Sequence, residues 1–377
     1  MRRSVWVVAA VIVVATGAGT VAATVPAGRS GVRPPATTAA RTDRAARERS
    51  PALPAPVIPA LGSPAAQVIG GPLMASTGTV VDPRAGTLPL PSVPASAWVI
   101  ANADTGQVLA ATDPHGEYGP ASTLKVLTAV TLIPLLNPSA EVVASQLATS
   151  QEPSSAWLVT GRSYNVADLF RALLMISAND AAVALTEATG SFDKGMALIN
   201  AEAQHLQAYD VVAKLPNGLD APGQVVSAYD EALIARQALR MPAFMAYDGT
   251  LTSRLELQPG EFETLVNQNY LLTQYPGGIG GKIGWTTPAE ATYVGLARRN
   301  GVTLIVTVLH CTAQQEVTSA EQLLDWGFAM NGRVSPVGTL VPPLAPLTVT
   351  VHHAKVHHAK SARHVSFRPA RTYPVPR

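Results

Sequence analysis

Ser122 and Lys125 form a pair whose types and spacing suggest nucleophilic catalysis. They directly precede an apolar run, Val126 to Ile133, that predicts a buried helix. At the start of this helix their side chains would lie one turn apart on the same face. A serine hydroxyl is a poor nucleophile at neutral pH, whereas a lysine in a desolvated site can lose its proton and act as the base. Helix-terminal N–H groups would also point at an oxyanion formed there. Taken alone, the pair also fits an N-cap serine with a solvated lysine, because SxxK is common by chance.

Two further pairs of polar residues occur later in the chain at short spacing. Ser177 and Asn179 lie between two predicted helices, where they could also serve as helix caps. Lys282 and Gly284 lie in a predicted strand after the glycine-rich stretch 277–281, which permits close approach of the backbone. A lysine there could also be a charge that protects a sheet edge. The three pairs in this order, SxxK, SxN and KxG, are far more specific than any one of them.

The middle of the chain carries helical patterns that would position the first two pairs. Asn165 can cap a helix that ends at Ile176 and presents leucines on one face. Similar apolar spacing continues after it, and Gly190 ends one of the following helices. These further helices are expected over residues 181–189, 192–206 and 229–239. Residues 241–268 are expected to be loops.

Strand patterns lie on both sides of this helical segment. One hairpin is predicted over 98–110, and another over 291–309, where Asn300-Gly301 is a strong hairpin signal. Strands at both ends with helices between them predict a single α+β domain over residues 93–334. Its antiparallel sheet would be flanked by helices, with an all-helical subdomain inserted between distant strands.

The two ends of the chain differ in composition from this domain. Residues 1–23 combine a charged start, a short apolar core and small residues up to Ala23. This predicts a secretory signal peptide, with an uncleaved membrane anchor as the alternative. Residues 24–92 are rich in Pro, Ala and Arg with hardly an aromatic, so we expect a disordered linker. Residues 335–377 are expected to be a basic, disordered tail rich in His and Pro.

The formal net charge of +2 conceals a strong asymmetry along the chain. Residues 1–92 carry nine Lys/Arg against three Asp/Glu, and residues 351–377 carry six against none, which leaves 12 against 22 between them. The ends are thus +6 each and the central body is −10. This argues against nucleic-acid binding, which requires a basic face. The single cysteine, Cys311, excludes an internal disulfide and a CxxC site, so we expect a buried thiol, no metal and no cofactor.

With the three motifs assembled, the sequence resembles the serine D-alanyl-D-alanine carboxypeptidases of the low-molecular-mass penicillin-binding type, specifically their actinobacterial branch. The resemblance extends over about residues 93–330. It is carried by residues 104–106 (DTG), 111–115, 120–125 (PASTLK), 173–182, 216–220 (PNGLD), 227–230 (SAYD) and 275–284. The resemblance implies a DD-peptidase/β-lactamase-like fold and hydrolysis of the terminal D-alanine from peptidoglycan stem peptides, with β-lactams as inhibitors.

The resemblance also implies roles for the first two motifs. Ser122 would be acylated by the substrate or by penicillin, and Lys125 would take its proton. Ser177 would pass a proton to the leaving amine, and Asn179 would hold the amide backbone of the substrate. The first three residues are thus the expected catalytic groups, and the fourth is a substrate-binding residue.

The KxG strand would complete the site, and it carries the departure from the family pattern. The backbone N–H of Trp285 would join that of Ser122 in the oxyanion hole, and Lys282, followed by Gly284, would face the terminal carboxylate. The family has threonine or serine where this chain has Ile283, which has no hydroxyl to bind that carboxylate. A hydrogen bond to a charged group is worth roughly 1.5–3 kcal/mol, so we expect acylation to be slowed about 10- to 100-fold.

Two other functions remain open on the sequence. A non-catalytic peptidoglycan-binding relative would keep the fold while Ile283 removed the reaction. A class A β-lactamase would need a deacylating glutamate, in an ExxxN context, well before the KxG strand. Glu263 and Asn267 have that spacing, but they lie almost against Lys282 in the sequence.

The N-terminal pattern and the charged ends predict where the protein acts. We expect it to be exported and to work outside the cytoplasm, in the cell wall or at the outer face of the cytoplasmic membrane. The basic ends would attract it to anionic wall polymers or to the membrane surface. The alternative is that these ends are only solubilising disorder.

Overall fold

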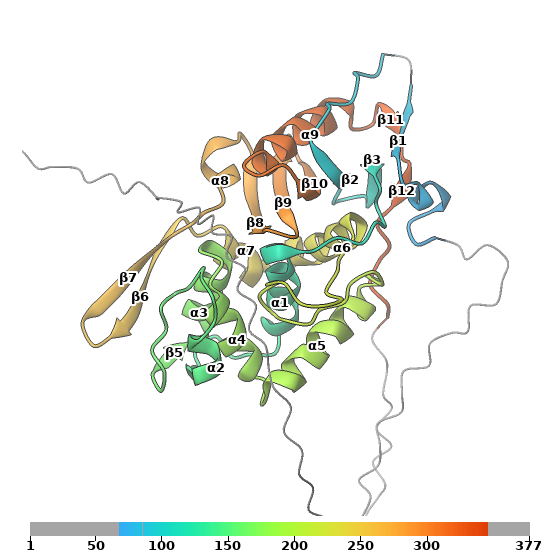
Figure 1. The fold of residues 1–377 in the computed structure, drawn as a ribbon. Helices are drawn as coiled ribbons and strands as arrows, with labels where there is room; N and C mark the ends of the chain where they lie inside the picture. Colours follow the sequence, from blue (N-terminus) through green and yellow to red (C-terminus); the bar gives the residue numbers. More distant parts are fainter. Residues whose placement is uncertain (1–67, 85, 346–377) are drawn as a thin grey trace, which may run out of the picture. The chain divides into compact units, whose positions relative to one another are not determined.

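The centre of the fold is an eight-stranded antiparallel sheet whose strands come from both ends of the described chain (Figure 1). The computed structural model describes residues 68–84 and 86–345. The strand order is β11-β1-β3-β2-β10-β9-β8, and β12 pairs with β3. The strands are β1 (Thr79–Pro83), β2 (Ala95–Asn102), β3 (Gln107–Thr112), β8 (Gly278–Thr286), β9 (Glu290–Arg299), β10 (Val302–Cys311), β11 (Val334–Ser335) and β12 (Gly338–Thr339).

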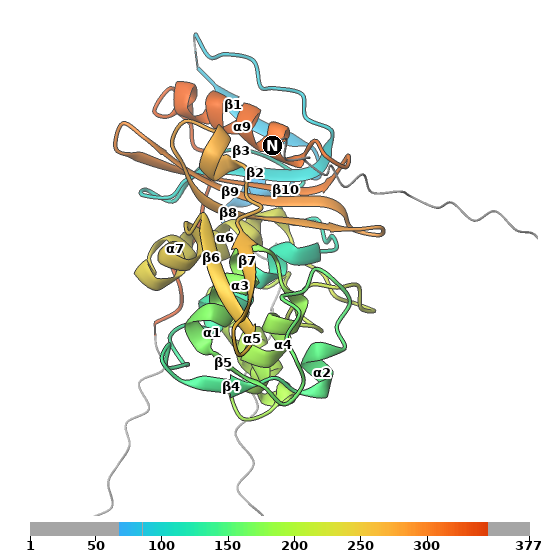
Figure 2. The ribbon, with the colours of Figure 1, turned by 90° about the vertical axis from the view of Figure 1, so that its left-hand side faces the viewer.

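Alternate residues of the central strands enter two different apolar clusters, as the two-residue period of a strand requires. In β2, Val99 packs in the cluster on the helical side of the sheet, whereas Ile100 packs with α9 (Glu316–Met330) on the other side. Figure 2 shows the resulting layers: α9 covers one face of the sheet, and α6 (Ala228–Leu239) lies against the other. The predicted α+β class is confirmed, and Cys311 is buried in the α9-side cluster.

The helical part lies between β3 and β8 in sequence and surrounds Ser122. It begins with a 3-10 turn, η2 (Ala121–Leu124), that continues into α1 (Lys125–Leu132). Every residue of α1 is buried, as its apolar run predicts. The other elements are β4 (Glu141–Val143), α2 (Gln146–Thr149), β5 (Ser163–Asn165), α3 (Val166–Met175), α4 (Asn179–Glu187) and α5 (Phe192–His205). The inserted segment is therefore mainly helical but not all-helical as expected, because it contains the short β4–β5 pair and a second strand pair over residues 252–266.

Two local signals in the sequence are confirmed in detail. The Asn165 side chain accepts a hydrogen bond from the Ala167 backbone N–H at 2.9 Å and so caps α3. Asn300 and Gly301 have φ of 50° and 80° and form the turn between β9 and β10. Positive φ at both positions matches the twist of a two-residue hairpin, which is why Asn-Gly predicts it well.

The ordered domain extends beyond the expected limits of 93 and 334 at both ends. β1 pairs with β3, with Thr79 opposite Thr112. β12 pairs with the same strand, with Gly338 opposite Val108. These short strands are held by hydrogen bonds to β3, so their order depends on a distant partner and not on their own composition.

Residues 241–268 are also more regular than expected. They contain α7 (Pro242–Asp248) and a hairpin of β6 (Thr252–Gln258) and β7 (Glu261–Val266), and α8 (Leu271–Gln274) follows. The alternation of buried Leu255 and Leu257 with exposed neighbours is a strand pattern. Its many charged residues concealed that pattern in the sequence.

Several predictions fall outside the described residues. The signal peptide or anchor of residues 1–23, most of the 24–92 linker and most of the basic tail lie in residues 1–67 and 346–377. They remain predictions. Within residues 68–84 and 86–345, none of the helices has both the length and the apolar character needed to cross a membrane.

Candidate active site

Ser122 is the one residue between Ala121 and Leu132 that is not buried. It lies in η2, directly after Ala121, whose φ of 46° is rare for a residue with a side chain. Strand β8 runs close beside it: a Cβ built on Gly284 would lie 2.7 Å from the Ser122 backbone nitrogen. Because only glycine leaves that space, Gly284 allows the strand and the serine to meet. Ser122 is therefore accessible at the junction of η2 and β8.

Lys125 contacts three oxygen atoms from three different segments. Its Nζ lies 2.8 Å from Ser122 Oγ, 2.7 Å from Asn179 Oδ1 and 2.6 Å from the Asn217 carbonyl oxygen. The amide and carbonyl oxygens can only accept hydrogen bonds, whereas a neutral amine has two N–H groups and one lone pair. When both N–H groups are donated to Asn179 and Asn217, the lone pair remains for the hydroxyl of Ser122. This is the arrangement that a general base requires.

The surroundings of Lys125 favour its neutral form. The side chain is 0% exposed, and this burial lowers its pKa well below the ordinary 10.5. The positive charge of Lys282 lowers the pKa further, while Asp180 raises it. Burial is the largest of these effects because a charged ammonium loses its hydration there. The neutral form, which can accept a proton, is therefore far more favoured in Lys125 than in an exposed lysine.

Asn179 begins α4, and its amide is held from both ends. While Oδ1 accepts from Lys125, Nδ2 donates to the Glu152 carbonyl oxygen at 2.7 Å. The Asn179 backbone N–H donates to the Ser154 carbonyl oxygen at 2.8 Å. The next residue, Asp180, accepts several hydrogen bonds from the same loop. The loop that follows Glu152 is therefore fixed to α4 beside the lysine.

That loop also carries an exposed tryptophan. Trp157 is 61% exposed and has φ 60°, while its neighbours Ala156 and Leu158 are buried. On the sheet side, Trp285 follows Gly284 in β8 and is 59% exposed. Trp285 lies opposite Ala291 of the α9-side cluster, so its side chain is on the face of β8 that points away from the helical part.

Ser177 lies between α3 and α4, two residues before Asn179. Its φ is 63° and it is buried, so the surrounding structure holds it in a conformation that L residues rarely adopt. Its hydroxyl makes no hydrogen bond to any described residue. The structure therefore brings Ser177 to the edge of the site without a direct bond to Ser122 or Lys125.

Lys282 lies in β8 on the helical side of the sheet, opposite Val294 of β9. It is 2% exposed, and its Nζ donates to the Ile283 carbonyl oxygen at 2.7 Å. Burial lowers the pKa of Lys282 to about 7, and the charge of Asp248 opposes this shift. The influence of Lys282 on the pKa of Lys125 shows that the two lysines share one electrostatic environment.

Ile283 faces the other side of the sheet from Lys282. It lies opposite Tyr293 of β9 and packs against the apolar cluster that contains α9. Neighbouring residues of a strand point to opposite faces, so this follows from the position of Lys282. The packing gives no support to the expectation that residue 283 would contact the substrate carboxylate.

Asn217 is the residue in contact with Lys125 that the motif analysis did not single out. It is fully buried, and its side chain donates to Gln151 Oε1 at 2.9 Å and accepts from the Leu219 N–H at 3.0 Å. These bonds fix the turn so that the Asn217 carbonyl points at Lys125. A backbone acceptor leaves no side-chain signal. The only available indication was the PNGLD stretch within the family resemblance.

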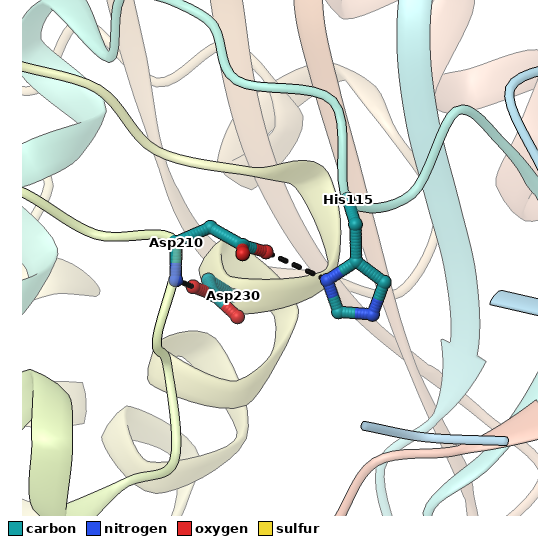
Figure 3. A group of neighbouring side chains, drawn as sticks. All are labelled: His115, Asp210 and Asp230. Atoms are coloured by element: carbon teal, nitrogen blue, oxygen red, sulfur yellow. Dashed lines mark hydrogen bonds and ion pairs between the residues drawn. The ribbon is translucent and has the colours of Figure 1, made fainter. Parts of the chain in front are cut away.

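A second cluster of titratable side chains consists of His115, Asp210 and Asp230 (Figure 3). Their possible ligand atoms lie within 4.8 Å of one another. His115 Nδ1 lies 2.6 Å from Asp210 Oδ2, and Nε2 lies 3.0 Å from the Ile69 carbonyl oxygen. Acceptors on both sides of the ring match the two N–H groups of an imidazolium, which has no lone pair for a metal. The bonding therefore favours an ion pair over a metal site.

Comparison with known proteins agrees with the geometry of the first site. The peptidase S11 family model, described as D-alanyl-D-alanine carboxypeptidase, matches residues 84–313. The chain is 38% identical over 262 residues to the D-alanyl-D-alanine carboxypeptidase DacB2 of Mycobacterium tuberculosis. That match covers 68% of this chain and 89% of the relative.

Solved structures show the same fold. The structure of a D-alanyl-D-alanine carboxypeptidase from Mycobacterium tuberculosis matches with a TM-score of 0.65 and 36% identity, over 70% of this chain and 100% of that chain. The Streptomyces K15 DD-transpeptidase matches with a TM-score of 0.61 and 25% identity, over 64% of this chain and 100% of that chain. The predicted DD-peptidase fold is confirmed.

Proposed function

The chain belongs to the D-alanyl-D-alanine carboxypeptidase family, and we propose that it removes the terminal D-alanine of peptidoglycan stem peptides through an acyl-enzyme on Ser122. The observation that carries the assignment is the contact set of Lys125. Two obligate acceptors take its N–H groups, and its lone pair is left for the Ser122 hydroxyl. A serine nucleophile needs such a base at neutral pH.

In the acylation step, Lys125 takes the hydroxyl proton while Ser122 Oγ attacks the carbonyl carbon of the penultimate D-alanine. The N–H groups of Ser122 and Trp285 stabilise the resulting oxyanion. The C–N bond then breaks, and the leaving nitrogen receives a proton through Ser177, which regains one from Lys125. A water molecule, deprotonated by Lys125, then attacks the ester carbonyl. The bond between the carbonyl carbon and Ser122 Oγ then breaks, and Lys125 returns its proton to Oγ, which releases the shortened peptide and restores the hydroxyl.

Substrate binding combines the charge of Lys282 with the amide of Asn179. Lys282 supplies the positive charge for the terminal carboxylate. Asn179 holds the amide backbone of the substrate next to Lys125.

The geometry favours this function over a class A β-lactamase. Glu263, the candidate deacylating residue, lies in β7 opposite Leu255 of β6. It is thus part of the β6–β7 hairpin and makes no hydrogen bond to Ser122 or Lys125 within the described structure. The preserved contact between Ser122 and Lys125 also favours an enzyme over a non-catalytic binding relative.

The site of action is proposed from the ends of the chain. An N-terminal signal pattern in residues 1–23 supports export, and the +6 charge at each end supports attraction to anionic wall polymers or to the membrane surface. Deleting residues 351–377 should weaken association with isolated walls at low salt and have little effect at high salt. Unchanged association at low salt would leave the tail as solubilising disorder.

Covalent labelling tests the proposed nucleophile. Intact-mass spectrometry after treatment with benzylpenicillin should show one adduct on the full chain and none on Ser122→Ala. Ser139→Ala, at an exposed serine, is the matched control and should label normally. Released D-alanine from a stem peptide ending in D-Ala-D-Ala should follow the same pattern. An adduct that survives Ser122→Ala would overturn the assignment, and rapid loss of the adduct would indicate a β-lactamase.

A further inference from the structure

Asp248 is a buried carboxylate in contact with the strand that carries Lys282. It ends α7 and is 1% exposed. Its Oδ2 accepts a hydrogen bond from the Gly281 backbone N–H at 2.7 Å. Its Oδ1 is buried and has no hydrogen-bond partner within residues 68–84 and 86–345. A buried carboxylate oxygen without a partner is destabilising unless a nearby charge compensates for it.

The backbone of β8 is shaped to receive this carboxylate. A Cβ built on Gly280 would lie 2.3 Å from Asp248 Oδ2, so the carboxylate occupies space that any other residue would fill. The hydrogen bond to Gly281 then fixes the strand one residue before Lys282. The glycines before the KxG motif therefore leave space for the Asp248 carboxylate, in addition to letting other backbone segments approach the strand closely.

Lys282 supplies the nearby positive charge that can compensate for the buried carboxylate of Asp248. Burial raises the pKa of Asp248 to about 7 and lowers the pKa of Lys282 to about 7. The charge of each group, together with the Gly281 hydrogen bond to Asp248, acts against the effect of burial and favours the ionised pair. Two other titratable groups share this environment. Burial lowers the pKa of Lys125 and Lys282 lowers it further, while burial raises the pKa of Tyr293 and Asp248 raises it further. When ionised, Asp248 is thus a negative charge that acts on Lys282.

We propose that Asp248 is a positioning residue for the substrate's terminal carboxylate: it fixes β8 at Gly281 and keeps Lys282 protonated in the empty site. An ammonium that is 2% exposed and has no anion nearby tends to lose its proton. A neutral Lys282 could not attract a carboxylate. The inference rests on the proposed function, in which Lys282 binds that carboxylate.

The pH dependence of acylation tests the inference. Benzylpenicillin carries a carboxylate, and its methyl ester does not. The rate of acylation by benzylpenicillin falls with rising pH on its alkaline limb, and in Asp248→Asn this limb should move to lower pH by about one unit. The acylation rate of the variant at pH 8 should therefore be about tenfold lower than that of the natural protein. The methyl ester should show no such shift. A merely structural role of Asp248 would lower both rates at every pH without moving the profile.

Two further variants serve as controls. Asp248→Glu keeps the charge and should keep the alkaline limb close to that of the natural protein. Asp325→Asn removes an exposed carboxylate that pairs with Arg299 and should change nothing. If Asp248→Asn folds and the alkaline limb of its pH profile does not shift, the inference is overturned. The proposed function is then still intact, because Ser122 still forms the adduct with benzylpenicillin. Absence of labelling in the natural protein overturns the proposed function itself.

A direct titration covers the case in which Asp248→Asn does not fold. The lysine side chains of the natural protein can be labelled with 13C at Cε, and the signal of Lys282 can be identified by its loss in Lys282→Arg. Coupling to Asp248 should give this signal two titration steps, because the two buried groups change each other's pKa. A single step would overturn the inference.

Discussion

Lys125 Nζ lies 2.8 Å from Ser122 Oγ, while its other two contacts are oxygen atoms that can only accept hydrogen bonds. The reaction requires the neutral form of this lysine. In that form the two N–H groups are donated to Asn179 and Asn217, and the lone pair is left for the hydroxyl of Ser122. A protonated Lys125 would have a third N–H directed at the hydroxyl and could not deprotonate it.

Replacing Lys125 with arginine should abolish most of the acylation. Arginine keeps the positive charge but cannot lose its proton in a protein. General-base catalysis contributes about 100- to 10,000-fold, so the second-order rate of benzylpenicillin acylation should fall by that range. Lys194→Arg, at an exposed lysine of α5, is the matched control and should react normally. A rate for Lys125→Arg within threefold of the natural protein would contradict the role of Lys125 as base.

The acylation rate should have a bell-shaped pH dependence. Lys125 must be neutral, so the rate rises as pH rises through its lowered pKa. Lys282 must be protonated, so the rate falls as pH rises through its pKa of about 7. The maximum is therefore expected close to neutrality, and it is measured with benzylpenicillin across the pH range. A rate that rises steadily up to pH 10 would rule out a role for protonated Lys282.

Asn179→Asp should shift the acid limb of this profile to higher pH. The carboxylate still accepts a hydrogen bond, but its negative charge favours the protonated form of Lys125. A shift of one unit in the pKa of Lys125 lowers the rate about tenfold at pH values on the acid limb. Asn165→Asp, which keeps the cap of α3, is the matched control. An acid limb that does not move would show that Asn179 is not in contact with the base.

Ile283→Thr should change the acylation rate by less than about threefold. The sequence predicts a 10- to 100-fold gain from a restored hydroxyl, but Ile283 packs on the α9 side of the sheet, opposite to Lys282. Replacing the partly buried isoleucine should instead lower the free energy of unfolding by about 1 kcal/mol, from lost apolar packing. Both quantities are measured on the same preparation. A gain of tenfold or more would show that a side chain at position 283 does reach the substrate carboxylate.

The His115 ion pair should stabilise the protein most at low pH. Burial lowers the pKa of His115, but the hydrogen bonds to Asp210 and Ile69 outweigh it and raise the pKa above 6.5. A raised pKa in the folded state means that the stabilisation is fully present below pH 6.5 and is lost as pH rises through the folded value. The difference in urea-unfolding free energy between the natural protein and His115→Gln should therefore shrink from pH 6 to pH 9. A difference that is constant with pH would show that His115 is neutral throughout.

Local spacing alone determined much of this protein. Ser122 and Lys125 meet because three residues on a helical turn place side chains on one face, whatever the rest of the chain does. The turn at Asn300-Gly301 and the cap at Asn165 are equally local, since each depends on the conformational preferences of one or two residues. The order of the three motifs was then enough to identify the fold.

Tertiary structure decided the partners that spacing cannot reveal. The acceptor from Asn217 is a backbone carbonyl, and Asp248 reaches β8 from a helix 33 residues earlier in sequence. The side of the sheet that Ile283 faces depends on the register of β8 with β9. Each of these is a contact between segments far apart in the chain, and its energy exists only once both segments are in place. The protonation state of Lys125 has the same origin, because burial within the folded domain sets its pKa.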